Sequence, residues 1–278
     1  MPIKKILCPT DFSNAANNAV EYAAYLAKKT GAQITLTHVL SLPVIYDDFN
    51  SPEMLTAFDA NRIEVEQILK NQAANVRNEF EVACDYDLML SNAEDADSDI
   101  AQSSEVFDLI VCGTNGADNI FQFYFGSHSY RISRNAAAAT LIVPEVCTFK
   151  GISNMVFLSG YKAGDQIQIG QLQEFVSAFN ANLTAMHVSE KDTPGNQELY
   201  HTFAHLLDEA FDFRMKINFH RMVNEDTAQA TEHYMHESHA DVLAVYMEKH
   251  GFLYRLFHTD LIKNITSYAD YPVLVFHR

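Results

Sequence analysis

Three of the 10 glycines in this 278-residue chain fall within one short stretch, at Gly113, Gly116 and Gly126. They follow the apolar run at residues 109–112, and Ser127 comes directly after the last of them. Glycines at the exit of a strand let backbone amides approach a phosphate closely, and the amides at a helix N-terminus favour an anion. The stretch therefore predicts a phosphate-binding loop that ends at a helix beginning with Ser127. The alternative is that the glycines only turn the chain and that Ser127 only caps the helix.

Two further residues stand at the ends of predicted strands. Asp11 follows the apolar run at residues 6–8, where its carboxylate would lie at the carboxyl edge of a sheet and could accept hydrogen bonds from sugar hydroxyls. Its alternative role is to cap the helix that follows. Val39 ends the second predicted strand, where the alternative is a place in the core.

Other chemistries lack their sequence signatures. His233, His236 and His239 recur every three residues, but on a helix such steps drift around the axis, so a polar helix face is favoured over a metal site. The chain has no GxSxG, Walker-type, HExxH or CxxC sequence. Its four scattered cysteines are therefore interpreted as buried thiols rather than as a disulfide framework.

The elements that would position these residues alternate between strand and helix. The sequence predicts strands near residues 5–10, 34–40, 87–90, 109–112 and 140–143. It predicts a helix from an N-cap at Ser13 to Gly31, a long amphipathic helix over 54–80, a short helix over 99–106 and a helix from Ser127. This alternation is typical of an α/β fold, with an open, mostly parallel, five-stranded sheet and helices on both faces.

The pattern occurs twice. The segment around His38 resembles the segment around His187, 149 residues later, and the segment around Asp108 resembles the one around Asp241, 133 residues later. The two copies join near residues 148–153. We therefore expect two tandem domains, residues 1–148 and residues 149–278.

Net charge and hydropathy restrict the classes of partner that the protein could bind. Lys and Arg number 19 and Asp and Glu 36, giving a net charge of −17, and such a surface repels nucleic acid and anionic membranes. No apolar run approaches the roughly 20 residues of a membrane-spanning helix, and the first residues do not form a signal peptide. We expect a cytoplasmic protein.

The order of elements in both halves, the PTDFS sequence at 9–13, the His38–Val39 pair and the glycine spacing resemble the universal stress protein family in its tandem, Rossmann-like form. The resemblance implies binding of ATP, or of AMP or ADP, with or without Mg²⁺, and pairing of the two halves through their last strands as an intramolecular pseudo-dimer. A homodimer of such chains remains open. The residues that the resemblance places at the nucleotide are Pro9, Thr10, Asp11, Val39, Gly113, Gly116, Gly126, Ser127 and His128.

No general base or activated nucleophile stands out beside the glycines, so a regulatory role with at most slow ATP hydrolysis is expected. One departure from the family is that Ala117 and Asp118 follow the second glycine and that no Lys or Arg occurs between Gly116 and Arg131. The alternative function is a nucleotide-free interaction module that binds a protein partner.

The second half departs from the motif at every position. The two offsets place Leu158 and Gly160 opposite Pro9 and Asp11, and they place no glycine opposite Gly113, Gly116 or Gly126, although Gly251 lies nearby. The residues opposite Gly113, Gly116, Gly126 and Ser127 are Tyr246, Lys249, Thr259 and Asp260. We therefore expect one nucleotide per chain, bound by residues 1–148.

Overall fold

The computed structural model describes residues 3–43, 52–92, 94–114, 127–159, 165–191, 193–210, 217–247 and 270–277. Its elements alternate along the chain as predicted. Those of the first half are β1 (Lys5–Pro9), α1 (Asn14–Thr30), β2 (Gln33–Ser41), α2 (Pro52–Phe80), β3 (Cys84–Ser91), α3 (Ala96–Ser103), the 3₁₀ helix η1 (Ser104–Val106), β4 (Leu109–Thr114), α4 (Ser127–Asn135) and β5 (Ala139–Pro144). Those of the second half are β6 (Asn154–Leu158), α5 (Asp165–Phe179), β7 (Asn182–Ser189), α6 (Pro194–Ala210), β8 (Ile217–Val223), α7 (Thr227–Glu237), β9 (Val242–Met247) and β10 (Val273–His277).

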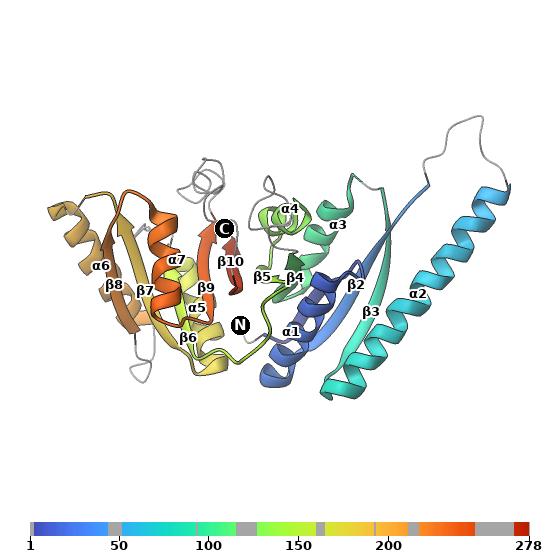
Figure 1. Ribbon diagram of the computed structural model, residues 1–278, viewed down its shortest axis with the longest axis horizontal. Helices are drawn as coiled ribbons and strands as arrows, with labels where there is room; N and C mark the ends of the chain where they lie inside the picture. Colours follow the sequence, from blue (N-terminus) through green and yellow to red (C-terminus); the bar gives the residue numbers. More distant parts are fainter. Residues whose placement is uncertain are drawn as a thin grey trace.

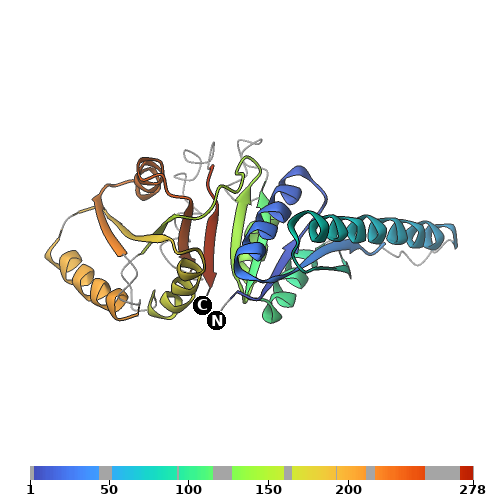
Figure 2. The same ribbon diagram turned by 90° about the horizontal axis from the view of Figure 1, so that it is seen from below.

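The ten strands that the structure describes form one sheet, in the order β3-β2-β1-β4-β5-β10-β9-β6-β7-β8. Neighbouring strands are parallel within each half. The exception is the central pair, β5 and β10, which is antiparallel with Leu141 opposite Leu274 (Figure 2). The halves therefore join through their last strands, as the resemblance implied.

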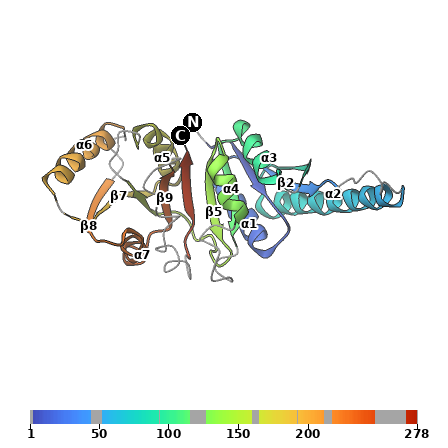
Figure 3. The ribbon, with the colours of Figure 1, turned by 90° about the horizontal axis from the view of Figure 1, so that it is seen from above.

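Helices cover both faces of the sheet (Figures 1 and 3). One buried cluster contains side chains from α1, α2, α5 and α6 and runs across both halves. On the opposite face α3 and α4 cover the first half and α7 covers the second. The N-terminal part of α2 projects beyond the strands, and its buried residues are all in its second half: Leu69, Ala73, Val76 and Phe80.

The predicted ends of α1 are confirmed. The Ser13 hydroxyl accepts a hydrogen bond from the Ala16 amide, and Gly31, with φ of 75°, donates its amide to the Ala27 carbonyl. A left-handed residue at this position favours glycine because glycine has no Cβ. The third strand is longer than predicted. The third helix was predicted over 99–106; it begins earlier, at Ala96, and continues as the 3₁₀ helix η1 from Ser104.

Equivalent contacts at both offsets confirm the internal repeat. The Asp108 carboxylate accepts hydrogen bonds from the amides of Lys4 and Lys5, at 2.9 Å each. The Asp241 carboxylate accepts from the amides of Ser153 and Asn154, at 2.7 and 2.9 Å. In each half this carboxylate ties the start of the fourth strand to the start of the first.

Candidate functional site: two helix N-termini at the strand-order reversal

The chain leaves β1 in a tight, hydrogen-bonded turn. The Thr10 hydroxyl accepts from the Phe12 amide at 3.1 Å, and Asp11 Oδ1 accepts from the Ser13 amide at 3.0 Å. Thr10 is buried, whereas Asp11 is exposed. The Asp11 carboxylate thus shapes the turn while Ser13 caps α1, so the capping role considered for Asp11 belongs to Ser13.

Phe12 holds this turn in an unusual conformation. Its backbone φ is 65°, in the left-handed region that residues other than glycine rarely adopt. Its ring stacks on the His38 ring with centroids 4.7 Å apart, and its carbonyl accepts from the Asn17 side chain. His38 Nδ1 lies 2.8 Å from the Thr10 carbonyl oxygen, so Nδ1 carries the proton that is donated.

The histidine contact also recurs in the second half. His187 Nδ1 lies 2.8 Å from the carbonyl oxygen of Ser159, the residue 149 positions after Thr10. The same contact in both repeats explains why His38 and His187 match in the sequence. Each histidine links the second strand of its half to the residue that follows the first strand.

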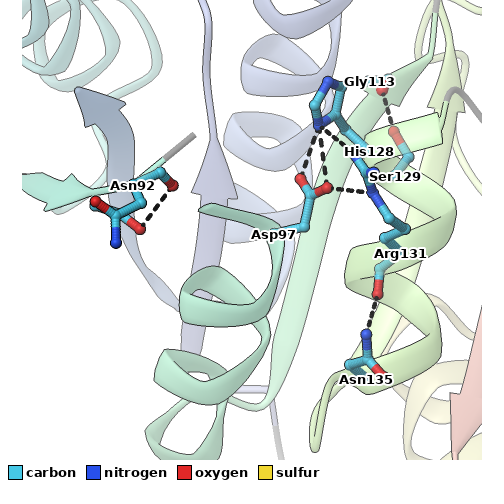
Figure 4. A network of polar contacts seen from close by, with 8 residues as sticks. Asn92, Asp97, Gly113, His128, Ser129, Arg131 and Asn135 are labelled. Carbon is cyan, nitrogen blue, oxygen red and sulfur yellow. Dashed lines mark hydrogen bonds and ion pairs between the residues drawn. The ribbon is translucent and has the colours of Figure 1, made fainter. Parts of the chain in front are cut away.

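Gly113, in β4, contacts the first turns of two helices, α1 on one face of the sheet and α4 on the other. A Cβ on Gly113 would lie 2.2 Å from the carbonyl oxygen of Ala15, in the first turn of α1. The Gly113 carbonyl oxygen accepts from the Ser129 hydroxyl, in the first turn of α4, at 2.8 Å (Figure 4). The glycine is therefore explained by packing, because only a residue without Cβ lets α1 approach β4 this closely.

Gly113 lies at the strand-order reversal. From β1 the chain proceeds through β2 and β3 in one direction, and from β4 through β5 in the other. Ligands of open α/β sheets bind outside the carboxyl ends of the strands at such a point. Helix N-termini carry unpaired amides and the positive end of the helix dipole, so the arrangement favours an anion.

A polar cluster joins α3 to the first turn of α4. The Asp97 carboxylate lies 2.9 Å from His128 Nδ1 and 2.5 Å from Arg131 Nε. Asp97 is buried, whereas the His128 and Arg131 side chains are 70% and 55% exposed. Nothing in the sequence distinguished Asp97 from the other acidic residues at 94–99.

The predicted site residues are only partly described. Pro9 ends β1, next to Thr10 and Asp11. Val39 lies two residues beyond Thr37, the last residue of β2 paired with β1, and its side chain packs against the α3–α4 core. Gly116 and Gly126 lie outside the described residues, as do Gly160, Lys249, Thr259 and Asp260, and so does the Ser127 side chain, although α4 begins at Ser127 as predicted.

The histidines and cysteines considered in the sequence do not form a metal site or a disulfide in the described residues. His233 lies 3.7 Å from Glu237, and His236 lies 3.9 Å from Asp270. Within the described ranges no group of three His, Cys, Asp or Glu side chains is placed to hold a metal ion. All four cysteines are free and buried, as predicted. Among the helices that the structure describes, none combines the length and the apolar character needed to span a bilayer.

The fold is that of an open, doubly wound α/β protein of two repeats. The two halves of the sheet follow the equivalent orders β3-β2-β1-β4-β5 and β8-β7-β6-β9-β10, and helices cover both faces. The sequence profile of the universal stress protein family matches residues 2–144, just over half of the chain. The chain therefore belongs to the universal stress protein family.

Solved structures share this fold. A universal stress protein from Archaeoglobus fulgidus DSM 4304 is 16% identical, with a TM-score of 0.75, and the match covers 99% of this chain and 98% of that one. A functionally unknown protein from Pseudomonas aeruginosa PAO1 is 13% identical, with a TM-score of 0.55 and coverage of 99% and 92%. No curated protein sequence matches the chain. The similarity to structures extends over both halves, whereas the family profile covers only the first.

Proposed function

We propose that residues 1–148 bind one adenine nucleotide at the carboxyl ends of β1, β2 and β4, and that the chain is a cytoplasmic regulatory protein. The observation that carries the proposal is that the first turns of α1 and α4 both contact Gly113, at the strand-order reversal. The phosphates would bind at the amides of α4 and of the glycine stretch that precedes it. Asp11 and the backbone of Val39 would bind the nucleoside.

The donor and acceptor types fit such a ligand. Asp11 is an exposed acceptor for ribose hydroxyls, held in place by the turn that Phe12 and His38 stabilise. Mg²⁺ would enter with the nucleotide, held mainly by its phosphates, since the described side chains do not form a metal site of their own.

The second half supports a single site per chain. Tyr246 is the counterpart of Gly113 at the 133-residue offset, and its side chain is buried in the cluster that includes α5 and α6. A tyrosine cannot permit the close helix approach that Gly113 permits. We therefore assign residues 149–278 a structural or partner-binding role.

Isothermal titration with ATP, AMP and adenosine tests the proposal, together with mass spectrometry of any nucleotide released from the purified protein. We expect one nucleotide per chain. Asp11→Asn keeps the oxygen that accepts from Ser13 but removes the charge, and a lost charge-assisted hydrogen bond should weaken binding by roughly tenfold or more.

Asp85→Asn is the matched control. Asp85 lies near the amino end of β3, at the other edge of the sheet from the carboxyl ends of the strands, and it accepts a hydrogen bond from Gln33. It should leave the affinity unchanged. Two equivalent sites per chain would contradict the asymmetric assignment. Absence of binding would contradict the proposal and favour the nucleotide-free interaction module, for which the fixed β5–β10 pairing provides the pseudo-dimer.

A further inference from the structure

The contacts of Asp97 set it apart from the other acidic residues of the first half. Its carboxylate is only 10% exposed, and both of its oxygens face α4 (Figure 4). His128 Nδ1 lies 2.9 Å from Oδ1 and 3.1 Å from Oδ2, and Arg131 Nε lies 2.5 Å from Oδ2. A buried carboxylate is costly unless it is paired and hydrogen-bonded, so this carboxylate strongly favours one arrangement of the two side chains.

The pairing leaves the outer atoms of both side chains available. Because a carboxylate only accepts hydrogen bonds, Nδ1 of His128 carries a proton, and Nε2 is directed away from the bond. Arg131 uses Nε toward Asp97, while its terminal nitrogen lies 3.2 Å from His128 Nδ1. The His128 imidazole and the Arg131 guanidinium therefore lie side by side, each more than half exposed, and both are paired with the buried Asp97 carboxylate.

Both side chains lie near the N-terminus of α4, His128 in the first turn and Arg131 at the start of the second. Between them in the sequence lies Ser129, whose hydroxyl donates a hydrogen bond to the Gly113 carbonyl oxygen at the end of β4. A guanidinium recognises phosphate oxygens through several parallel N–H donors, and an adjacent imidazole adds a further polar contact. Arg131 is also the first basic residue after the glycines.

We propose that His128 and Arg131 form the terminal-phosphate subsite of the nucleotide site and that Asp97 is the positioning residue that holds them there. The inference rests on the proposed function, because it assigns the residues that distinguish ATP from AMP and adenosine. Asp97 acts only through its two partners and does not touch the ligand.

The described part of the second half has no such anchor on the corresponding helix. The buried residues of α7, the helix that corresponds to α3, carry no charge: they are Thr227, Ala228, Ala230, Thr231 and Met235. The carboxylate is therefore not required by the fold of these repeats. Among the described residues, it is present only in the half that carries the glycine motif.

The test is the dependence of affinity on phosphate number. In the unmodified protein, affinity should rise from adenosine through AMP to ATP. In Arg131→Gln and Asp97→Asn the gain from the added phosphates should fall by roughly tenfold to a hundredfold, with adenosine binding unchanged. Arg131→Lys keeps the charge without the planar donor set, so it should recover part of the gain.

Asp99→Asn is the matched control for Asp97, because Asp99 lies on the same helix but bonds to the Ser91 hydroxyl at the end of β3. It should leave every affinity unchanged. Arg131 is 55% exposed, so its variants should fold even if Asp97→Asn does not.

The outcomes separate the two proposals. If adenosine and ATP bind but Arg131→Gln changes neither affinity, the subsite is wrong and the proposed function stands. If neither ligand binds, the proposed function fails, and NMR titration of the His128 ring signals with pyrophosphate tests the subsite directly. Shifts that disappear in Arg131→Gln support it, and the absence of shifts overturns it.

Discussion

Gly113→Ala adds one methyl group at the contact between β4 and α1. The added carbon would lie 2.2 Å from the Ala15 carbonyl oxygen, 2.5 Å from its carbonyl carbon and 2.9 Å from the Ala16 amide nitrogen. Side-chain β carbons essentially never come closer than 3.0 Å to other atoms, so the helix would have to retreat by at least 0.8 Å. All three neighbouring atoms are backbone, and no rotamer change can relieve the overlap.

The cost follows from two opposing effects. Overpacking of a well-packed interior costs about 1–3 kcal/mol, and a rigid helix backbone places this site at the upper end. Replacing glycine by alanine in a strand recovers about 0.5–1 kcal/mol of backbone entropy. We expect a net loss of about 2 kcal/mol, which corresponds to a fall in melting temperature of about 4–8 °C for a domain of this size.

Thermal and urea unfolding followed by circular dichroism measure this loss. Gly31→Ala is the comparison, because Gly31 has open space around its missing Cβ but a φ of 75°, so its cost of about 1 kcal/mol is conformational. A Gly113→Ala protein as stable as the parent would refute the packing explanation. The glycine would then have to be explained by a ligand.

Three further measurements address the join between the halves and the core. Asn18→Ala removes two 2.9 Å hydrogen bonds, to the carbonyls of Pro144 at the end of β5 and of Cys147 beyond it, and urea unfolding should show a loss of about 1–3 kcal/mol. Phe149→Ala removes a half-buried ring that packs against two tyrosines of α1, and differential scanning calorimetry should show a loss of about 2 kcal/mol. Burial raises the pKa of Cys84 and Cys112 to about 12 and that of Cys147 to about 11, from an ordinary 9.0. Between these values the unfolded chain has released protons that the folded chain retains, so stability should fall as pH rises above 9, by up to about 1.4 kcal/mol per pH unit for each thiol, and Cys112→Ala should reduce that slope.

The sequence predicted those parts of the fold that depend on local chemistry. Ser13 and Gly31 marked both ends of α1 because capping requires a side-chain acceptor at one end and a left-handed residue at the other. The two repeat offsets were correct because Asp108 and Asp241 each bridge strands that any copy of the fold must bring together.

The site was less accessible to sequence reasoning. Gly113 was interpreted through phosphate approach, yet its closest constraint is a helix nearly 100 residues earlier in the chain, a contact that no local pattern encodes. Asp97 lies in an acidic stretch, and only the packing of α3 against α4 separates it from Asp99. The strained Phe12 gave no signal, because its ring partner His38 belongs to another strand.

The antiparallel pairing of β5 with β10 has a consequence for how the chain assembles. Every residue of β5 is buried, so the first half alone would present an apolar strand with unpaired backbone groups. In a protein of one repeat, covering that edge requires a second molecule, and the folded fraction then depends on concentration. Here the partner strand is part of the same chain, so the pairing is intramolecular and survives dilution. The pairing depends on β5 and β10 alone, so the rest of the second half can diverge from the first while the sheet stays whole.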